Sequence, residues 1–278
     1  MAKHLAIIEG NHEQLVQFHD DGTITGAAEG FAAALSKLDD TLSFTIYRPH
    51  FADFNLSDAL FDHVDGVIFT GSAVNWSADD SEAKPARDVM EQALLQKKPI
   101  FGSCYGMQLA VAVLGGQNRA HPDATEFAIA RNIKVNEAGQ SHPLYQDKPV
   151  LFDAKCMHRD EVARLPSGAV SLSGNEHSPY QSMVYETEST LLWAVQYHPE
   201  LTFKEIATYI RRNDVKSFSD VVRFAENLGI DPELERITLE LERLDSHDES
   251  ALQRRYQLDE TMADENHCRE LLNYLKQI

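Results

Sequence analysis

Residues 101–108 read Phe101-Gly102-Ser103-Cys104-Tyr105-Gly106-Met107-Gln108, a cysteine with a glycine two residues away on either side. The apolar run Lys98 to Phe101 has strand character, and Met107 to Leu114 is typical of a buried helix that ends at Gly115-Gly116. A sharp strand-to-helix turn with this spacing is a nucleophile elbow. Glycine is needed because side chains there would collide with the neighbouring strand and helix. The helix N-terminus favours negative charge and hence a thiolate, so we predict that Cys104 is a catalytic nucleophile.

A second segment supplies a base and a group that orients it. Gln196-Tyr197-His198-Pro199-Glu200 follows the apolar run Leu191 to Val195, which we expect to be a strand. Side chains two residues apart point the same way on an extended backbone, so His198 and Glu200 can lie on one side. The imidazole would take the thiol proton, and the carboxylate would fix the tautomer of the ring. We therefore predict a Cys104–His198–Glu200 triad.

These two motifs, in this order and at this spacing, resemble the class I (triad) glutamine amidotransferase domain, most nearly the glutaminase that feeds ammonia to GMP synthetase. The resemblance runs from about Leu5 to about Glu205. It includes Asp65-Gly66-Val67-Ile68-Phe69-Thr70-Gly71-Ser72, and His158-Arg159-Asp160-Glu161-Val162 with Leu165-Pro166-Ser167-Gly168. The activity that the resemblance implies is hydrolysis of the γ-amide of glutamine through a γ-glutamyl thioester on the cysteine.

The resemblance also implies roles for residues around the nucleophile. One donor of the oxyanion hole is the backbone N–H of the residue after the nucleophile, here Tyr105. Gly71 falls where the family supplies the second donor, in a segment that otherwise reads as a turn. In relatives a glutamine at the position of Gln108 helps to hold the substrate, and we assign Gln108 and Ser72 to substrate binding.

Alternating strands and helices predict an α/β fold with a mostly parallel sheet flanked by helices, as in class I glutamine amidotransferases, which are flavodoxin-like. In such a sheet the site lies outside the carboxyl ends of the strands. The expected strands are Lys3 to Glu9, Phe44 to Tyr47 and Gly66 to Phe69, and the expected helices are 28–38, Leu56 to Phe61 and Ser81 to Lys97. A mixed, partly antiparallel half is expected from the β-rich pieces Glu126 to Val135, Val150 to Met157, Ala169 to Leu172 and Gln181 to Tyr185.

We expect two parts, an amidotransferase-like domain over 1–213 and a helical C-terminal extension over 214–278 that packs on it. Asp231-Pro232 reads as an N-cap with proline at the first helical position, and Cys268 lies on the apolar face of the last helix. Two apolar stripes in this extension must be buried: Phe218, Val221, Val222, Ala225 and Leu228, then Leu234, Ile237, Leu241 and Leu244. No linker rich in Gly, Pro or Ser separates the parts, which favours packing over a docking or dimerisation surface. A homo-oligomer stays open.

Composition limits the partners. The net charge of -19 disfavours nucleic acid and anionic membranes. No apolar run approaches the roughly 20 residues of a membrane span, and no charged start precedes an apolar segment. Three cysteines without C-x-x-C spacing suit a reducing cytosol, so we expect a cytoplasmic protein.

The sequence also lacks the usual signals of a metal or cofactor. No histidine pair has H-E-x-x-H spacing, and there is neither a Walker A sequence nor G-x-G-x-x-G. We therefore expect no metal site and no cofactor. His158-Arg159-Asp160 superficially resembles a kinase loop, but no Gly-rich loop or Asp-Phe-Gly accompanies it. The resemblance to the amidotransferase family places this segment near the mouth of the site, so His158 and Asp160 are expected to be structural or to face a partner.

Three functions are compatible with these features. The first is a glutaminase subunit that supplies ammonia to a separate synthase. The second is a stand-alone hydrolase that releases a different amine from a γ-glutamyl amide. The third is a non-catalytic interaction module, which the intact triad disfavours because folding does not require all three of its residues.

Overall fold

The computed structural model describes residues 2–20, 24–122, 125–212, 214–245, 250–258 and 260–278. Within these residues a nine-stranded sheet has the order β4-β1-β5-β6-β13-β12-β11-β8-β9. The first five strands are parallel: β4 (Ser43–Tyr47), β1 (His4–Ile8), β5 (Gly66–Phe69), β6 (Ile100–Ser103) and β13 (Leu191–Val195). The others are antiparallel to their neighbours: β12 (Ser182–Glu186), β11 (Val170–Gly174), β8 (Glu126–Val135) and β9 (Leu151–His158).

Two small antiparallel pairs lie outside this sheet. They are β2 (Gln17–Phe18) with β3 (Ile24–Thr25), and β7 (Gln117–Ala120) with β10 (Asp160–Arg164). The helices are α1 (Ala27–Leu38), α2 (Lys84–Leu95), α3 (Tyr105–Val113), α4 (Glu137–Gln140), α5 (Phe203–Arg212), α6 (Asp214–Leu228), α7 (Leu234–Leu244), α8 (Ser250–Arg255), α9 (Asp264–His267) and α10 (Arg269–Gln277). The parallel half and the mixed half confirm the predicted α/β fold.

Alternate side chains of β1 serve the two faces of the parallel half. Leu5 and Ile7 join a core that α1 and α10 cover, and Ala6 and Ile8 join a core that α2 and α3 cover. Residues one apart on a strand point to opposite faces, so a strand buried on both sides is apolar throughout. This burial explains why Lys3 to Glu9 was recognisable as a strand.

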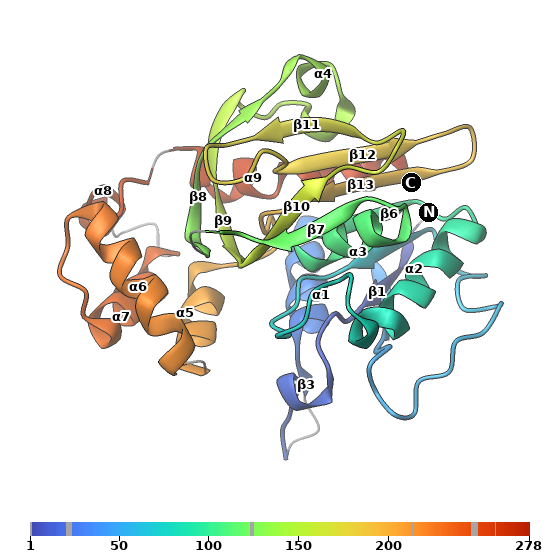
Figure 1. Ribbon diagram of the computed structural model, residues 1–278, viewed down its shortest axis with the longest axis horizontal. Helices are drawn as coiled ribbons and strands as arrows, with labels where there is room; N and C mark the ends of the chain where they lie inside the picture. Colours follow the sequence, from blue (N-terminus) through green and yellow to red (C-terminus); the bar gives the residue numbers. More distant parts are fainter. Residues whose placement is uncertain (1, 21–23, 123–124, 213, 246–249, 259) are drawn as a thin grey trace.

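Helix α10 completes the first of these cores. Leu271, Tyr274 and Leu275 are buried in it, and the Tyr274 hydroxyl donates to the backbone oxygen of Pro99 over 2.9 Å. The ring of Tyr274 also lies 5.5 Å from that of Phe101, centroid to centroid. A bond from Lys3 Nζ to the backbone oxygen of Leu275 brings the two ends of the chain together, as Figure 1 shows.

Helices α5 to α8 form a group at one end of the molecule, beside β8 and β9 (Figure 1). Phe127 and Ile129 of β8 share a buried cluster with Phe203 and Ile206 of α5 and with residues of the later helices, Val221, Ala225, Ile237 and Leu241. The side chain of Phe218 and the proposed boundary at residue 213 lie outside the described residues, so the division into 1–213 and 214–278 stays a prediction. No helix among the described residues is long and apolar enough to cross a bilayer.

Three local predictions are wrong. Leu56 to Phe61 is not a helix but a series of turns in which Leu60 N–H donates to Ser57 and Asp62 N–H to Ala59, because so short a segment does not repay helix nucleation. Helix α7 begins at Leu234 rather than after Asp231, since the backbone oxygen of Asp231 accepts the N–H of Glu233 in a tight turn. Cys268 is the N-cap of α10, and its thiol donates to the backbone oxygen of Pro199 over 3.2 Å.

Candidate active site

Cys104 stands at a tight turn between β6 and α3. Its φ of 50° and ψ of -102° lie outside the regions that L-residues favour, and such strain is typical of functional positions. A Cβ on Gly102 would lie 2.8 Å from the carbonyl carbon of Gly106, and one on Gly106 would lie 2.4 Å from the backbone oxygen of Phe69. Both glycines are therefore required by close backbone approach. The strand, turn and helix predicted for this segment are present.

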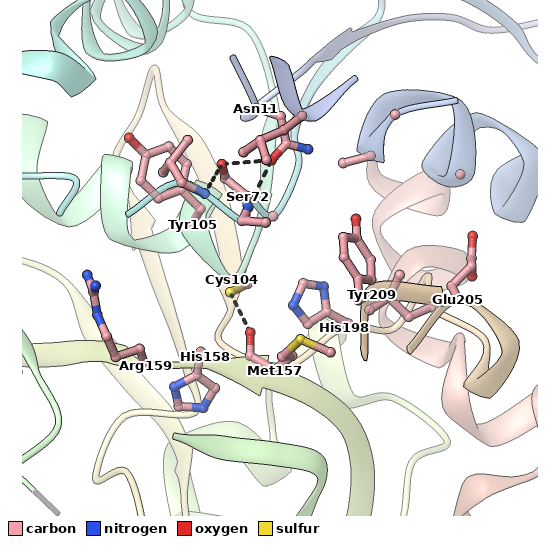
Figure 2. A pocket seen from close by; sticks show the side chains of 18 of the residues that line it. Asn11, Ser72, Cys104, Tyr105, Met157, His158, Arg159, His198, Glu205 and Tyr209 are labelled. Atoms are coloured by element: carbon pink, nitrogen blue, oxygen red, sulfur yellow. Dashed lines mark hydrogen bonds between the residues drawn. The ribbon is translucent and has the colours of Figure 1, made fainter. Parts of the chain in front are cut away.

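His198 and Glu200 follow the end of β13, the strand beside β6. His198 Nδ1 lies 2.7 Å from Glu200 Oε1, and Figure 2 shows the His198 ring next to the sulfur of Cys104. Burial lowers the pKa of His198, but the negative charges of Glu200 and Cys104 outweigh it and raise the pKa to about 10. The ring is consequently protonated at neutral pH and has a proton to give.

Ser103 holds the carboxylate of Glu200 from below. Its fully buried hydroxyl is 3.1 Å from Glu200 Oε1 and 3.0 Å from Oε2, and it donates to this carboxylate. No motif in the sequence indicated this role of Ser103. The available signal was a polar side chain at the buried end of a strand, directly before the nucleophile.

Cys104 opens into a pocket of about 450 Å³. The part around Gly71, Cys104, Tyr105, Gln108 and Arg159 is here named the Cys104 end. The part lined by α1, α5 and α6 is named the helical end, and residues of these helices that line it are Gly30, Glu205, Tyr209 and Asp220. In Figure 2, Glu205 and Tyr209 lie on the far side of His198 from Cys104.

The predicted oxyanion and substrate residues all line this pocket. Gly71 is close to the predicted triad, since a Cβ there would lie 2.5 Å from His198 Cε1. Ser72 and Asn11 hold the loop in place: Ser72 Oγ is 2.9 Å from the backbone oxygen of Gly10 and 3.1 Å from Asn11 Oδ1, which accepts the N–H of Ala73. The oxyanion role of Gly71 and Tyr105 and the substrate role of Ser72 remain predictions.

Gln108 and the segment 158–160 form the opposite wall of the Cys104 end. Gln108 Nε2 donates to the backbone oxygen of Asp160 over 2.8 Å, so the predicted substrate residue also fixes this wall. Arg159 lines the pocket with a side chain that is 52% exposed, and its Nε lies 2.6 Å from Asp160 Oδ1. Arg159 is a pocket residue that the sequence did not indicate, and it places a guanidinium, paired with Asp160, at this end.

A cluster below the pocket contains groups that could hold a metal ion. The nearest ligand-type atoms of Glu126, His158 and His177 all lie within 4.8 Å of one another. His158 Nε2 is 2.7 Å from Glu126 Oε2, and its Nδ1 is 3.1 Å from the backbone oxygen of Asp160. The three residues come from separate segments of the chain, so no spacing motif in the sequence predicts this cluster. Glu126 and His158 are hydrogen bonded to each other, and the ring of His177 lies edge-on to that of His158 at 5.7 Å, centroid to centroid.

Comparison with known proteins gives a consistent result. The family described as glutamine amidotransferase class-I matches residues 28–217. A gamma-glutamyl-L-1-hydroxyisopropylamide hydrolase from a Pseudomonas species is 33% identical over 156 residues, which are 54% of this chain and 51% of the hydrolase. A glutamine-hydrolysing GMP synthase subunit of Methanocaldococcus jannaschii is 29% identical over 154 residues, 55% of this chain and 73% of that protein. The chain thus spans about half the length of the hydrolase.

Solved structures agree on the fold. A glutamine amidotransferase from Thermotoga maritima has a TM-score of 0.63 at 16% identity, with 100% of this chain and 98% of that chain covered, so the likeness takes in the C-terminal helices. A putative GMP synthase subunit from Thermoplasma acidophilum has a TM-score of 0.56 at 18% identity and covers 72% of this chain and 86% of its own. With the family match over more than half of its length, the chain belongs to the class-I glutamine amidotransferase family.

Proposed function

We propose that this chain hydrolyses the C–N bond of a γ-glutamyl amide through a thioester on Cys104. The observation that carries the proposal is the geometry of the site, with the His198 imidazole held 2.7 Å from Glu200 and next to a cysteine on a strained turn. A general acid beside a nucleophile, with a third group that orients it, is the arrangement that acyl transfer needs.

In the first half of the reaction the Cys104 thiolate attacks the amide carbon. The backbone N–H groups of Tyr105 and Gly71 hold the oxyanion, each such donor being worth roughly 3–4 kcal/mol. This attack forms the C–S bond, and the C–N bond of the tetrahedral intermediate then breaks as His198 gives its proton to the leaving nitrogen. In the second half His198 takes a proton from water, the hydroxide attacks the thioester, and the thiolate and glutamate are released.

In one form of this function the substrate is glutamine, and the ammonia passes to a separate synthase. The name of the Methanocaldococcus relative, a subunit of GMP synthase, supports this form. The synthase would supply the acceptor of the ammonia.

In the other form the chain works alone on a larger γ-glutamyl amide. The pocket supports this form because it continues past His198 to α1, α5 and α6, and ammonia needs no such space. The name of the Pseudomonas relative, a hydrolase of a γ-glutamyl amide, points the same way.

Steady-state hydrolysis of glutamine and of γ-glutamyl alkylamides by the purified chain tests the proposal. We expect glutamate release from at least one of them, together with labelling of Cys104 by a glutamine-like electrophile. Faster release from an alkylamide selects the stand-alone hydrolase, and labelling without turnover selects the subunit that requires a synthase. If Cys104 is not labelled and none of the amides is hydrolysed, the proposed chemistry is refuted.

A further inference from the structure

The charged side chains at the two ends of the pocket differ in how far nearby opposite charges compensate them. Arg159 lies at the Cys104 end, and the acidic side chains of Glu205 and Asp220 line the helical end. Figure 2 shows Arg159 and Glu205 on opposite sides of the nucleophile. Asp160 also lines the Cys104 end and forms an ion pair with Arg159 there. A ligand that crosses Cys104 therefore meets a compensated Arg159 on one side and the carboxylate of Glu205 on the other.

Glu205 has one carboxylate oxygen committed to the protein and one that faces the pocket wall. Oε2 accepts the N–H and the hydroxyl of Thr202, at 2.7 and 2.8 Å, in the capping box that starts α5. Oε1 points towards α1, where a Cβ on Gly30 would lie only 2.9 Å away. No Lys, Arg or His of the described residues forms an ion pair with Glu205. The negative charge is thus held in a fixed position without a cation of its own.

Asp220 of α6 also lines the pocket. Its side chain is 18% exposed, and its nearest cation, Arg223 Nη1, is 3.8 Å away on the same helix. Burial raises the pKa of Asp220, while a hydrogen bond from Thr125 and the charge of Arg223 lower it. A second, partly desolvated carboxylate therefore lines the helical end, and a positive group there would offset the cost of its burial.

The two parts of a γ-glutamyl amide, the glutamyl group and the amine, fit the two ends of the pocket in one orientation of the substrate. The thiolate must reach the amide carbon, so the glutamyl part and the amine part extend to opposite sides of Cys104. The α-carboxylate of the glutamyl part suits Arg159, because guanidinium binds carboxylate well. The amine part then lies past His198, which protonates its nitrogen, and enters the helical end.

We propose that the helical end is an amine-binding subsite that selects γ-glutamyl amides of diamines, whose second amino group is a cation paired with Glu205 and Asp220. An alkylammonium is protonated at neutral pH, since its pKa is about 10. This proposal rests on the proposed γ-glutamyl amide hydrolysis and adds the class of leaving amine.

Three substrates of similar length test the selection: the γ-glutamyl amides of 1,4-diaminobutane, of n-pentylamine and of 4-aminobutyrate. They place a cation, a methyl group or a carboxylate at the helical end. We expect kcat/KM for the cationic amide to exceed that for the neutral amide by about tenfold and that for the anionic amide by more. Raising the salt concentration should shrink these ratios, because partly exposed ion pairs are screened.

Matched variants locate the effect. Glu205→Gln keeps an oxygen to cap α5 and removes the charge, and Asp220→Asn does the same on α6. Each should lower the ratio of kcat/KM for the cationic over the neutral amide several-fold, and the double variant should bring it close to one. Glu226→Gln is the control, because it removes the same charge from the exposed face of α6, outside the pocket, and should leave the ratio unchanged.

Calorimetric binding of 1,4-diaminobutane, with 1,4-butanediol as the uncharged reference, gives a readout that does not depend on turnover. The subsite is supported if the diamine binds, the diol does not, and Glu205→Gln and Asp220→Asn weaken the binding of the diamine. This result does not depend on whether a synthase is needed for catalysis. Equal turnover of the three amides, or diamine binding that the two substitutions leave intact, would overturn it. Loss of Cys104 labelling and of all turnover refutes the hydrolysis instead, so the two failures can be told apart.

Discussion

At the Cys104 end of the pocket the functional atoms are held by backbone contacts and short hydrogen bonds, whereas at the helical end they are side chains projecting from helices. Gly102 and Gly106 are required by approaches below 3 Å, and Ser103 holds Glu200. Glu205 and Asp220 instead carry charges that are only partly compensated. The reaction tolerates little displacement of the reacting atoms, so it needs groups that are held by backbone contacts and short hydrogen bonds. Selection among amines can rely on side chains that project from helices, because a single substitution there changes which amine is bound.

The largest expected effect concerns the nucleophile. Cys104→Ala should lower kcat at least roughly 10⁴-fold with any γ-glutamyl amide, because no other group can form the thioester. Cys104→Ser should be nearly inactive as well. Glutamate release measures the effect, and Cys156→Ala is the control, since that buried thiol lies in β9 and packs in the core. Full activity of Cys104→Ala would place the chemistry elsewhere in the molecule.

Glu200, the proposed carboxylate of the triad, comes next. Glu200→Gln should lower kcat by about 10²–10⁴-fold, because an amide no longer fixes the tautomer of His198 or stabilises its charge. Single-turnover kinetics with a γ-glutamyl amide measure the acylation step directly. A variant that acylates at the normal rate would show that the 2.7 Å contact of His198 with Glu200 is only structural.

The protonation of His198 can be followed by itself. The pKa of this ring is raised to about 10, so NMR of the imidazole should show it protonated at pH 7 and titrating near pH 10. Because the folded pKa exceeds the ordinary 6.5, the resulting stabilisation is fully present below pH 6.5 and is lost as the pH rises to about 10. In Glu200→Gln the midpoint should fall. A wild-type midpoint at 6.5 or below would contradict the ion pair.

A smaller effect is expected from the backbone of the elbow. Gly106→Ala puts a Cβ 2.4 Å from the backbone oxygen of Phe69, so the free energy of unfolding should fall by roughly 1–3 kcal/mol. Urea denaturation measures it. Ala112→Gly in the same helix, expected to cost about 1 kcal/mol through helix propensity alone, is the control. Equal or greater stability of Gly106→Ala would mean that the turn can open.

The smallest effect is expected at the helical end. Gly30 lies inside α1, so Gly30→Ala should gain up to about 1 kcal/mol of helix propensity while its Cβ crowds Glu205 Oε1. The ratio of kcat/KM for an alkylamide over that for glutamine should fall a few-fold, by our estimate from the lost space. Steady-state kinetics and thermal unfolding measure the two terms. An unchanged ratio would show that α1 does not limit the amine.

The sequence predicted most of what lies at the Cys104 end and little of the helical end. The elbow and the segment 196–200 are contiguous motifs in which chemistry and backbone geometry use the same few residues. The sequence does not indicate a role of Glu205 in the pocket, because a glutamate three residues after Thr202 is already explained as part of a capping box. Asp220 sits in a helix where periodicity reports only the apolar face. Residues 56–61 show the converse limit, since an apolar pattern of that length fits a turn as well as a helix.

The position of α10 has a consequence for how this protein is made. Tyr274 packs against Phe101 and Trp193, which lie in the strands that lead to Cys104 and His198, and it bonds to Pro99, 175 residues earlier in the chain. On the ribosome the elbow and its partner strand emerge well before this support has been translated. The nascent sheet therefore exposes an apolar face beneath the nucleophile until residue 275 is released. A chain that terminates before α10 would contain Cys104, His198 and Glu200 but would lack the helix that packs against the strands leading to them.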